Sequence, residues 1–134
     1  MELHPVKLKQ LLLVEPQSLF RRTLATVARQ LKVADVVETS SYEAAQNLLE
    51  TQRFDGLMLA VGDGVASLNL LQSLRMGKTR NTRVLPLALM AEAIDTDTIE
   101  VFRTMSPQRI LLVPFKVKTA LEVVTGLVAE PPKL

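Results

Sequence analysis

Hydrophobic and polar positions along the chain follow two periods in alternation. Short apolar runs bounded by polar residues are typical of buried parallel strands, whereas apolar residues three and four positions apart are typical of helices that bury one face. The short runs predict five strands, at residues 8–14, 34–40, 54–61, 83–91 and 109–113. Pro86 lies inside the fourth run, and because proline cannot donate to a β-ladder we expect it near the start of that strand.

A segment with helical spacing follows each predicted strand. Helices are predicted at residues 20–31, 40–52, 65–76, 95–105 and 117–128. Ser40 and Glu43 have the spacing of a capping box, and Asp95 or Thr96 is a candidate N-cap of the fourth helix. Gly77 follows the third helix, where a residue in the left-handed conformation commonly ends a helix.

The alternation amounts to five βα units, which predicts an α/β fold with a doubly wound parallel sheet and helices on both faces. We expect a single domain over residues 1–134, with its core at about 7–129. Ligands of such folds bind at the carboxyl ends of the strands. Five stretches are therefore candidate site segments: Glu15-Pro16, Thr39-Ser40, residues 60–64, Met90-Ala91 and Val113-Pro114.

The amino-acid composition excludes or disfavours several kinds of functional site. The 134 residues include no cysteine and a single histidine, His4, which excludes thiol chemistry and disfavours a histidine-based triad or metal site. Sixteen basic and 14 acidic residues give a net charge of only +2, too little to indicate nucleic-acid binding. No signal-peptide core and no apolar run of about 18 residues is present, so we expect a cytoplasmic protein without a membrane partner.

Several short motifs, taken in order, resemble the receiver domain of two-component response regulators, the CheY-like family. They are "LLLVEP", "FDGLMLA", "NLLQSLR", "PLALMAEA" and "LLVPF", and the resemblance extends over about residues 7–129. It implies a flavodoxin-like (βα)5 fold with strand order 2-1-3-4-5. It also implies a role in phosphorelay signal transduction, with other signalling proteins as partners.

The resemblance also places the family's functional positions on this chain. The metal-binding acid pair falls on Glu15 and Pro16, and the phosphoacceptor aspartate falls on Ala60. The hydroxyl residue falls on Met90 or Ala91, and the lysine falls on Val113, directly before the retained Pro114.

Most of the groups needed for phosphoryl transfer are therefore absent at these positions. An alanine methyl has no lone pair with which to attack phosphorus, and phosphoryl transfer depends on charge stabilisation that these side chains lack. We expect a degenerate pocket in a pseudo-receiver, with no catalytic residue, no cofactor and no Mg²⁺ site, in a protein that is not an enzyme.

Two acids near this pocket leave alternatives open. Asp63 lies three residues after Ala60 between two glycines, and it is the candidate for an atypical phosphoacceptor or a solvated loop acid. Glu15 is either an acid paired with Arg21 or Arg22, or a buried remnant of the lost site whose pKa desolvation would raise.

Excess apolar residues mark a candidate partner face. In the receiver family partners commonly bind the face formed by the fourth helix, fifth strand and fifth helix, and there the sequence offers Ile99, Val101, Phe102, Ile110 and Val123. These residues fit either a docking surface, including one for a homodimer, or the hydrophobic core.

Two further features produce expectations. The stretch 75–83 contains Arg75, Lys78, Arg80 and Arg83, which fit a phosphate-binding loop or, more simply, a solvated turn without aromatic partners. The receiver resemblance also implies a cis peptide bond between Val113 and Pro114, a geometry that X–Pro bonds can adopt.

Overall fold

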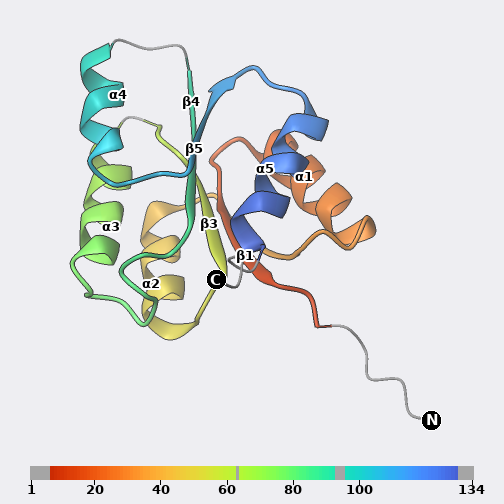
Figure 1. Ribbon diagram of the computed structural model, residues 1–134, viewed down its shortest axis with the longest axis horizontal. Coiled ribbons are helices and arrows are strands. Elements are labelled where there is room, and N and C mark those ends of the chain that lie inside the picture. The colour runs from red at the N-terminus through yellow and green to blue at the C-terminus, as the bar shows by residue number, and fades with distance from the viewer. Residues whose placement is uncertain (1–6, 63, 93–95, 130–134) are drawn as a thin grey trace, which may run out of the picture.

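The protein forms one parallel sheet of five strands in the order β2-β1-β3-β4-β5 (Figure 1). The computed structural model describes residues 7–62, 64–92 and 96–129. The strands are β1 Gln10–Val14, β2 Asp35–Thr39, β3 Gly56–Ala60, β4 Leu87–Glu92 and β5 Arg109–Val113. The predicted fold class and strand order are confirmed.

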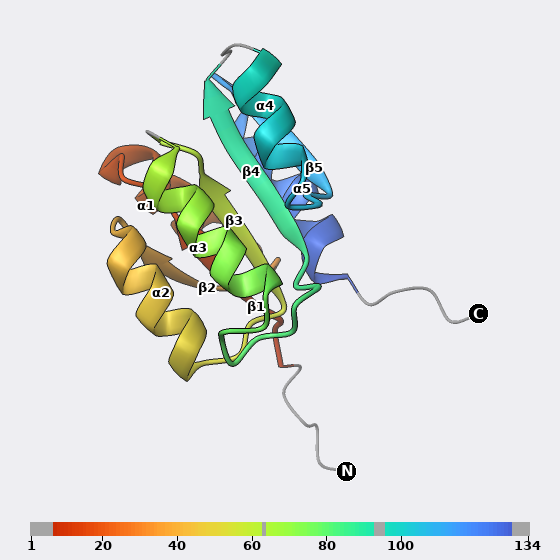
Figure 2. The same ribbon diagram turned by 90° about the vertical axis from the view of Figure 1, so that its left-hand side faces the viewer.

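Helices cover both faces of the sheet. They are α1 Ser18–Gln30, α2 Tyr42–Thr51, α3 Val65–Arg75, α4 Thr96–Arg103 and α5 Val117–Val128. One face is covered by α1 and α5, and the other by α2, α3 and α4 (Figures 1 and 2). Two hydrophobic clusters therefore form, one on each side of the sheet.

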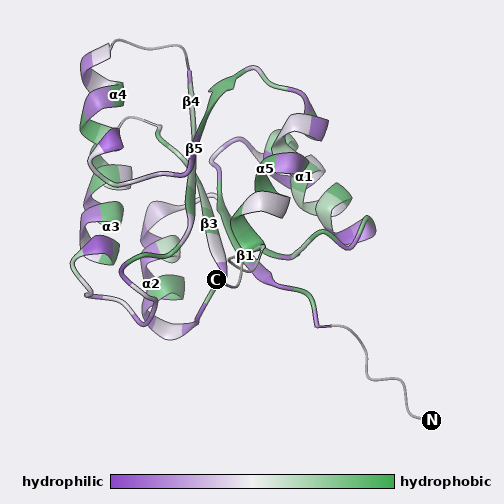
Figure 3. Cartoon of the chain, viewed as in Figure 1, coloured by the Kyte–Doolittle hydropathy of each residue, from purple (hydrophilic) through white to green (hydrophobic). Residues whose placement is uncertain are grey.

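The central strands are apolar along their whole length because both of their faces are buried. Every residue of β3 is buried, and β1 is buried from Leu11 to Val14. The helices instead alternate hydrophobic and hydrophilic stripes, and Figure 3 shows the contrast. This difference is the physical origin of the two periods in the sequence.

Most element boundaries differ from the predicted ones by a few residues, and two of the differences have a clear physical cause. The fourth strand begins at Leu87 rather than at residue 83, directly after Pro86, which has no N–H to contribute to a ladder. The second helix begins at Tyr42, and its N-cap is Ser41, whose Oγ accepts a hydrogen bond from the Ala44 N–H at 3.1 Å. The capping box placed on Ser40 was therefore wrong by one residue.

Other local predictions are confirmed. Gly77 follows α3 with a φ of +77°, and its N–H donates to the Leu74 carbonyl. The Val113-Pro114 peptide bond is cis. The N-cap of α4 is a different case: Thr96 is the first helical residue rather than the cap, and the other candidate, Asp95, lies outside the described residues.

The guanidinium of Arg75 is held by hydrogen bonds within the protein and is not part of a solvated basic loop. Its guanidinium donates to the carbonyl oxygens of Met105 at 2.8 Å, Arg83 at 3.0 Å and Leu85 at 2.8 Å, and partial burial lowers its pKa. These bonds connect the end of α3 to the loops before β4 and β5. The prediction of Arg75 as a phosphate ligand was therefore wrong, because its guanidinium is already bonded within the protein. Lys78, Arg80 and Arg83 are exposed.

The loop between α3 and β4 contains a buried polar residue, Asn81. Its side-chain oxygen accepts from the Phe54 N–H at 2.7 Å, and its side-chain nitrogen donates to the carbonyls of Leu49 and Gln52, both at 2.8 Å. Asn81 therefore joins the end of α2 to the approach of β3. In the described part of the chain, no helix combines the length and the hydrophobicity that a membrane crossing requires.

Candidate functional site

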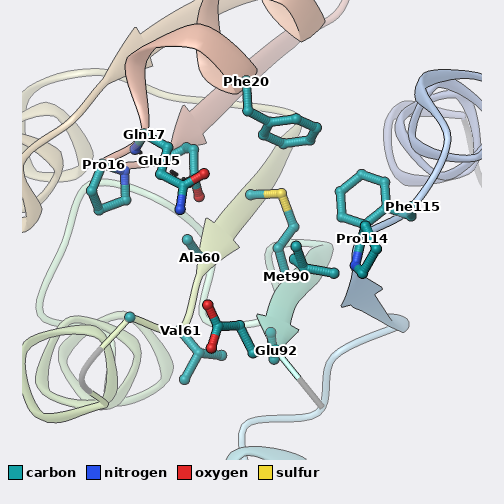
Figure 4. Close-up of a pocket in the computed structure, with 13 residues that line it drawn as sticks. Glu15, Pro16, Gln17, Phe20, Ala60, Val61, Met90, Glu92, Pro114 and Phe115 are labelled. Carbon is teal, nitrogen blue, oxygen red and sulfur yellow. Dashed lines mark hydrogen bonds between the residues drawn. The ribbon is translucent and has the colours of Figure 1, made fainter.

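The carboxyl ends of β1, β3, β4 and β5 surround one cavity of about 430 Å³ (Figure 4). Its lining consists of Glu15, Pro16, Gln17, Phe20, Ala60, Val61, Gly62, Met90, Ala91, Glu92, Val113, Pro114 and Phe115. All seven residues predicted for the degenerate pocket are in this set. The structure therefore brings together positions that are up to 99 residues apart in the sequence (Glu15 to Pro114).

Strand register explains why these residues meet. Ala60 of β3 is paired with Met90 of β4, and Glu92 of β4 is paired with Val113 of β5. Successive side chains of a strand point to opposite faces, so Met90 and Glu92 share the face covered by α1 and α5. Ala60 and Met90 belong to the hydrophobic cluster on that face, whereas Ala91 belongs to the cluster on the other. Of the two candidates for the hydroxyl position, Met90 is therefore the neighbour of Ala60.

Two aromatic residues complete the apolar wall of the cavity. The rings of Phe20 and Phe115 meet edge to face, with centroids 5.1 Å apart and an interplanar angle of 85°. In Figure 4 the Met90 side chain reaches toward them from β4. Phe20 is the first residue of the helix predicted at 20–31, and Phe115 is the last residue of the motif "LLVPF". Neither was predicted as a site residue. Only their positions next to Glu15-Pro16 and Val113-Pro114 hinted at this role.

Glu15 is the buried acid of the site, with 8% of its surface exposed. Its Oε1 accepts a hydrogen bond from the Gln17 N–H at 3.3 Å. Burial raises the pKa of its carboxyl, while the Gln17 hydrogen bond and the charge of Arg21 oppose that rise. Arg21 donates to the main-chain oxygen of Glu15 at 2.9 Å and forms an ion pair with Glu38 at 3.2 Å. The interpretation of Glu15 as a buried acid with a raised pKa agrees with this geometry.

Glu15 should make the stability of the protein depend on pH. Since its pKa is higher in the folded chain than in the unfolded chain, its contribution to stability is fully present below the unfolded pKa and is lost as pH rises through the folded pKa. We expect Glu15→Gln to raise the free energy of unfolding, relative to wild type, more at about pH 8 than at about pH 4.

Denaturant unfolding of both proteins at the two pH values measures this difference. Glu122→Gln, at an exposed position on α5, is the matched control and should leave the pH profile of wild type unchanged. A Glu15→Gln profile parallel to that of wild type would contradict the prediction.

The described residues of the cavity do not fit a magnesium ion. Glu15 and Glu92 are the described carboxyl groups that line it, and the walls between them are apolar. Mg²⁺ demands near-octahedral oxygen coordination, usually with carboxylates and water. Among residues 7–62, 64–92 and 96–129, no group of three or more acidic or histidine side chains could hold a metal ion. Asp63, the alternative phosphoacceptor, lies outside the described residues.

The predicted partner face is only partly exposed. Phe102 and Val123 are 3% and 4% exposed, because they point from α4 and α5 into the two hydrophobic clusters, so their assignment to an exposed face was wrong. Val101 is 46% exposed, and Ile99 and Ile110 are half-buried. Leu112, which the sequence reading did not name, is 49% exposed on the edge strand β5. We call Ile99, Val101, Ile110 and Leu112 the α4–β5 patch.

Solved structures that superimpose on this chain include receiver domains of response regulators and of a histidine kinase. The non-phosphorylated HemR receiver domain from Leptospira biflexa superimposes with a TM-score of 0.77 at 20% identity, over 94% of this chain and 98% of that one. The chemotaxis response regulator CheY4 of Vibrio cholerae has a TM-score of 0.78 at 14% identity, over 90% and 99% of the two chains. The receiver domain of a sensor histidine kinase from Pseudomonas aeruginosa, solved with magnesium in its active-site cleft, has a TM-score of 0.75 at 17% identity, over 90% and 97%.

No protein-family model and no curated protein matches the chain. The similarity to the solved structures therefore shows that this chain has the same fold as receiver domains.

Proposed function

We propose that this chain is a pseudo-receiver of two-component signalling, which passes on a signal by docking to other signalling proteins and does not accept a phosphoryl group. It acts in the cytoplasm, without a cofactor and without enzymatic activity. The fold shared with receiver domains and the receiver-like order of the sequence motifs support the signalling role.

The observation that supports the loss of phosphorylation is Ala60. It ends β3 and lines the cavity at the position where the receiver resemblance expects the phosphoacceptor aspartate. A methyl group cannot attack phosphorus. Its neighbour Met90 and the nearby Val113 have no hydroxyl or ammonium group with which to stabilise the transferred phosphoryl oxygens.

The part of the pocket that corresponds to the magnesium site of receivers also lacks a ligand. Pro16 occupies the place of one of the two acids that hold magnesium in receivers, and Glu15 alone remains. The hydrogen bond from Gln17 and the burial of Glu15 fit a structural role in the turn from β1 to α1. A receiver without its metal ligands would lack the ion that bridges phosphoryl donor and acceptor.

Docking is the remaining means of communication for such a domain. In the α4–β5 patch, Val101 and Leu112 are exposed and Ile99 and Ile110 are half-buried. Exposed apolar residues of this kind commonly belong to protein interfaces. We propose this patch as the docking surface, used either with another signalling protein or with a second copy of this chain.

Treatment with acetyl phosphate and Mg²⁺, followed by intact mass measurement, tests the proposal. We expect no phosphoryl adduct and no amide chemical-shift changes with beryllofluoride, while a receiver domain that retains the aspartate responds under the same conditions. An adduct that disappears in Asp63→Asn would replace the proposal with the alternative, a receiver phosphorylated at Asp63. An adduct that survives Asp63→Asn would overturn both.

A further inference from the structure

The cavity at the carboxyl edge of the sheet has the size and walls of a small-molecule site. Its volume of about 430 Å³ lies within the roughly 300–1,000 Å³ typical of ligand pockets. Aromatic, aliphatic and thioether side chains form most of the lining, with Phe20, Met90 and Phe115 on one side and Ala60 and Val61 on another (Figure 4). Pockets that bind organic molecules combine such walls with a few polar groups.

The charged side chains among the described residues that line this cavity are both carboxyl groups. Glu15 extends from the end of β1 and Glu92 from the end of β4, and Figure 4 shows them on opposite sides of the cavity. Among the described residues that line it, none is lysine, arginine or histidine. The nearby Arg21 is engaged with the Glu15 main chain and with Glu38. A bound anion would therefore face two carboxyl groups without a counter-charge from the lining.

The two carboxyl groups of the cavity favour a cation as its ligand. The apolar walls, however, do not favour a metal ion. A hydrated divalent ion needs several oxygen ligands, whereas the surfaces around Glu15 and Glu92 are apolar. An organic ammonium group satisfies both conditions, because its hydrogen atoms bond to carboxyl oxygens while its carbon body displaces water from apolar walls.

We propose that this cavity binds a small organic amine, whose ammonium group lies between Glu15 and Glu92 and whose apolar body contacts Phe20, Met90 and Phe115. The polar end of the ligand lies toward the strand ends, where Glu92 is exposed, and the apolar end lies under the aromatic pair. The site rests on the cavity itself and stands whether or not the chain is a signalling domain.

Phenethylamine is a suitable probe, with two matched compounds of nearly the same size. Phenethyl alcohol keeps the ring and removes the charge, and hydrocinnamate keeps the ring and reverses it. We expect phenethylamine to give saturable amide chemical-shift changes centred on Ala60, Met90 and Phe115, with a Kd on the order of 1 mM. The alcohol should bind about tenfold more weakly, and hydrocinnamate should not bind.

Substitutions measure separately how the Glu92 charge and the apolar walls contribute to the binding affinity. Glu92→Gln, at an exposed position, should weaken phenethylamine binding about fivefold and leave the alcohol unaffected. Ala60→Leu should fill the cavity and abolish binding of both. Glu122→Gln on the outer side of α5 is the matched control and should change neither affinity.

Equal binding of amine and alcohol would overturn the proposal, as would binding of hydrocinnamate or shifts remote from the cavity. The absence of saturable shifts with phenethylamine up to about 10 mM would also overturn it. Should Ala60→Leu fail to fold, the compound series and Glu92→Gln still decide the result, because the latter changes only an exposed side chain.

Discussion

Asn81→Ala is expected to lower the free energy of unfolding by about 2 kcal/mol. The substitution removes the acceptor of the Phe54 N–H and the donor to the Leu49 and Gln52 carbonyls. The buried Phe54 N–H is left without a partner, which costs roughly 1–3 kcal/mol, whereas the Leu49 carbonyl keeps the hydrogen bond from the Arg80 N–H and the exposed Gln52 can bond to water. The loss would be a large share of the roughly 5–15 kcal/mol that stabilises a typical domain.

Urea unfolding followed by far-ultraviolet circular dichroism measures the effect. Asn69→Ala, at an exposed position on α3, is the matched control and should change stability by less than about 0.5 kcal/mol. Asn81→Asp offers a finer comparison, because it keeps an acceptor for Phe54 while it removes the donor to Leu49 and Gln52. A loss below about 1 kcal/mol for Asn81→Ala would mean that water replaces the amide at this loop.

Rebuilding the receiver pocket is expected to produce a protein that acetyl phosphate phosphorylates, whereas the proposed function predicts no adduct on the wild type. The combined variant Pro16→Asp, Ala60→Asp, Met90→Thr and Val113→Lys restores a second metal ligand, a nucleophilic carboxylate, a hydroxyl donor and an ammonium group. All four positions line one cavity, so the new side chains converge on the same space. We expect the mass spectrum to change from no adduct to a predominant phosphoryl adduct.

Single substitutions should not be sufficient. Ala60→Asp alone places a carboxylate among Glu15 and Glu92 without the cations that phosphoryl transfer needs. The same background with Ala60→Asn in place of Ala60→Asp is the matched control, since the amide has nearly the same shape and is not a nucleophile. A rebuilt variant that folds, binds Mg²⁺ and still gives no adduct would show that these four positions are not the reason for the missing chemistry.

The strands and the location of the site were predictable because they depend on features that the sequence repeats, whereas the strand order was implied by the resemblance to receiver domains. Five apolar runs and five helical stripes imply a parallel sheet covered on both faces, and the carboxyl ends of its strands must meet at one edge. Glu15, Ala60, Met90 and Val113 were identified in this way, and all four line the cavity.

Exposure on the helices was less predictable than position in the sheet. Phe102 and Val123 appeared to be surplus apolar residues on a partner face, yet both are buried. A helix has no strict inside and outside in its sequence, because the width of its buried stripe depends on how its neighbours pack. Leu112 lies on an edge strand with fewer neighbours, and it is exposed although its sequence context resembles that of a core strand.

The sequence by itself determined the fold class, the edge of the sheet at which the candidate site lies and the alanine at position 60, since each follows from local periodicity or from the identity of a single side chain. Tertiary structure alone decided that Asn81 is buried, that Arg75 bonds to carbonyls of two loops and that Phe20 meets Phe115 over the cavity. These facts depend on contacts between segments far apart in the chain. A polar loop residue has the same local sequence whether water or a distant backbone group satisfies it.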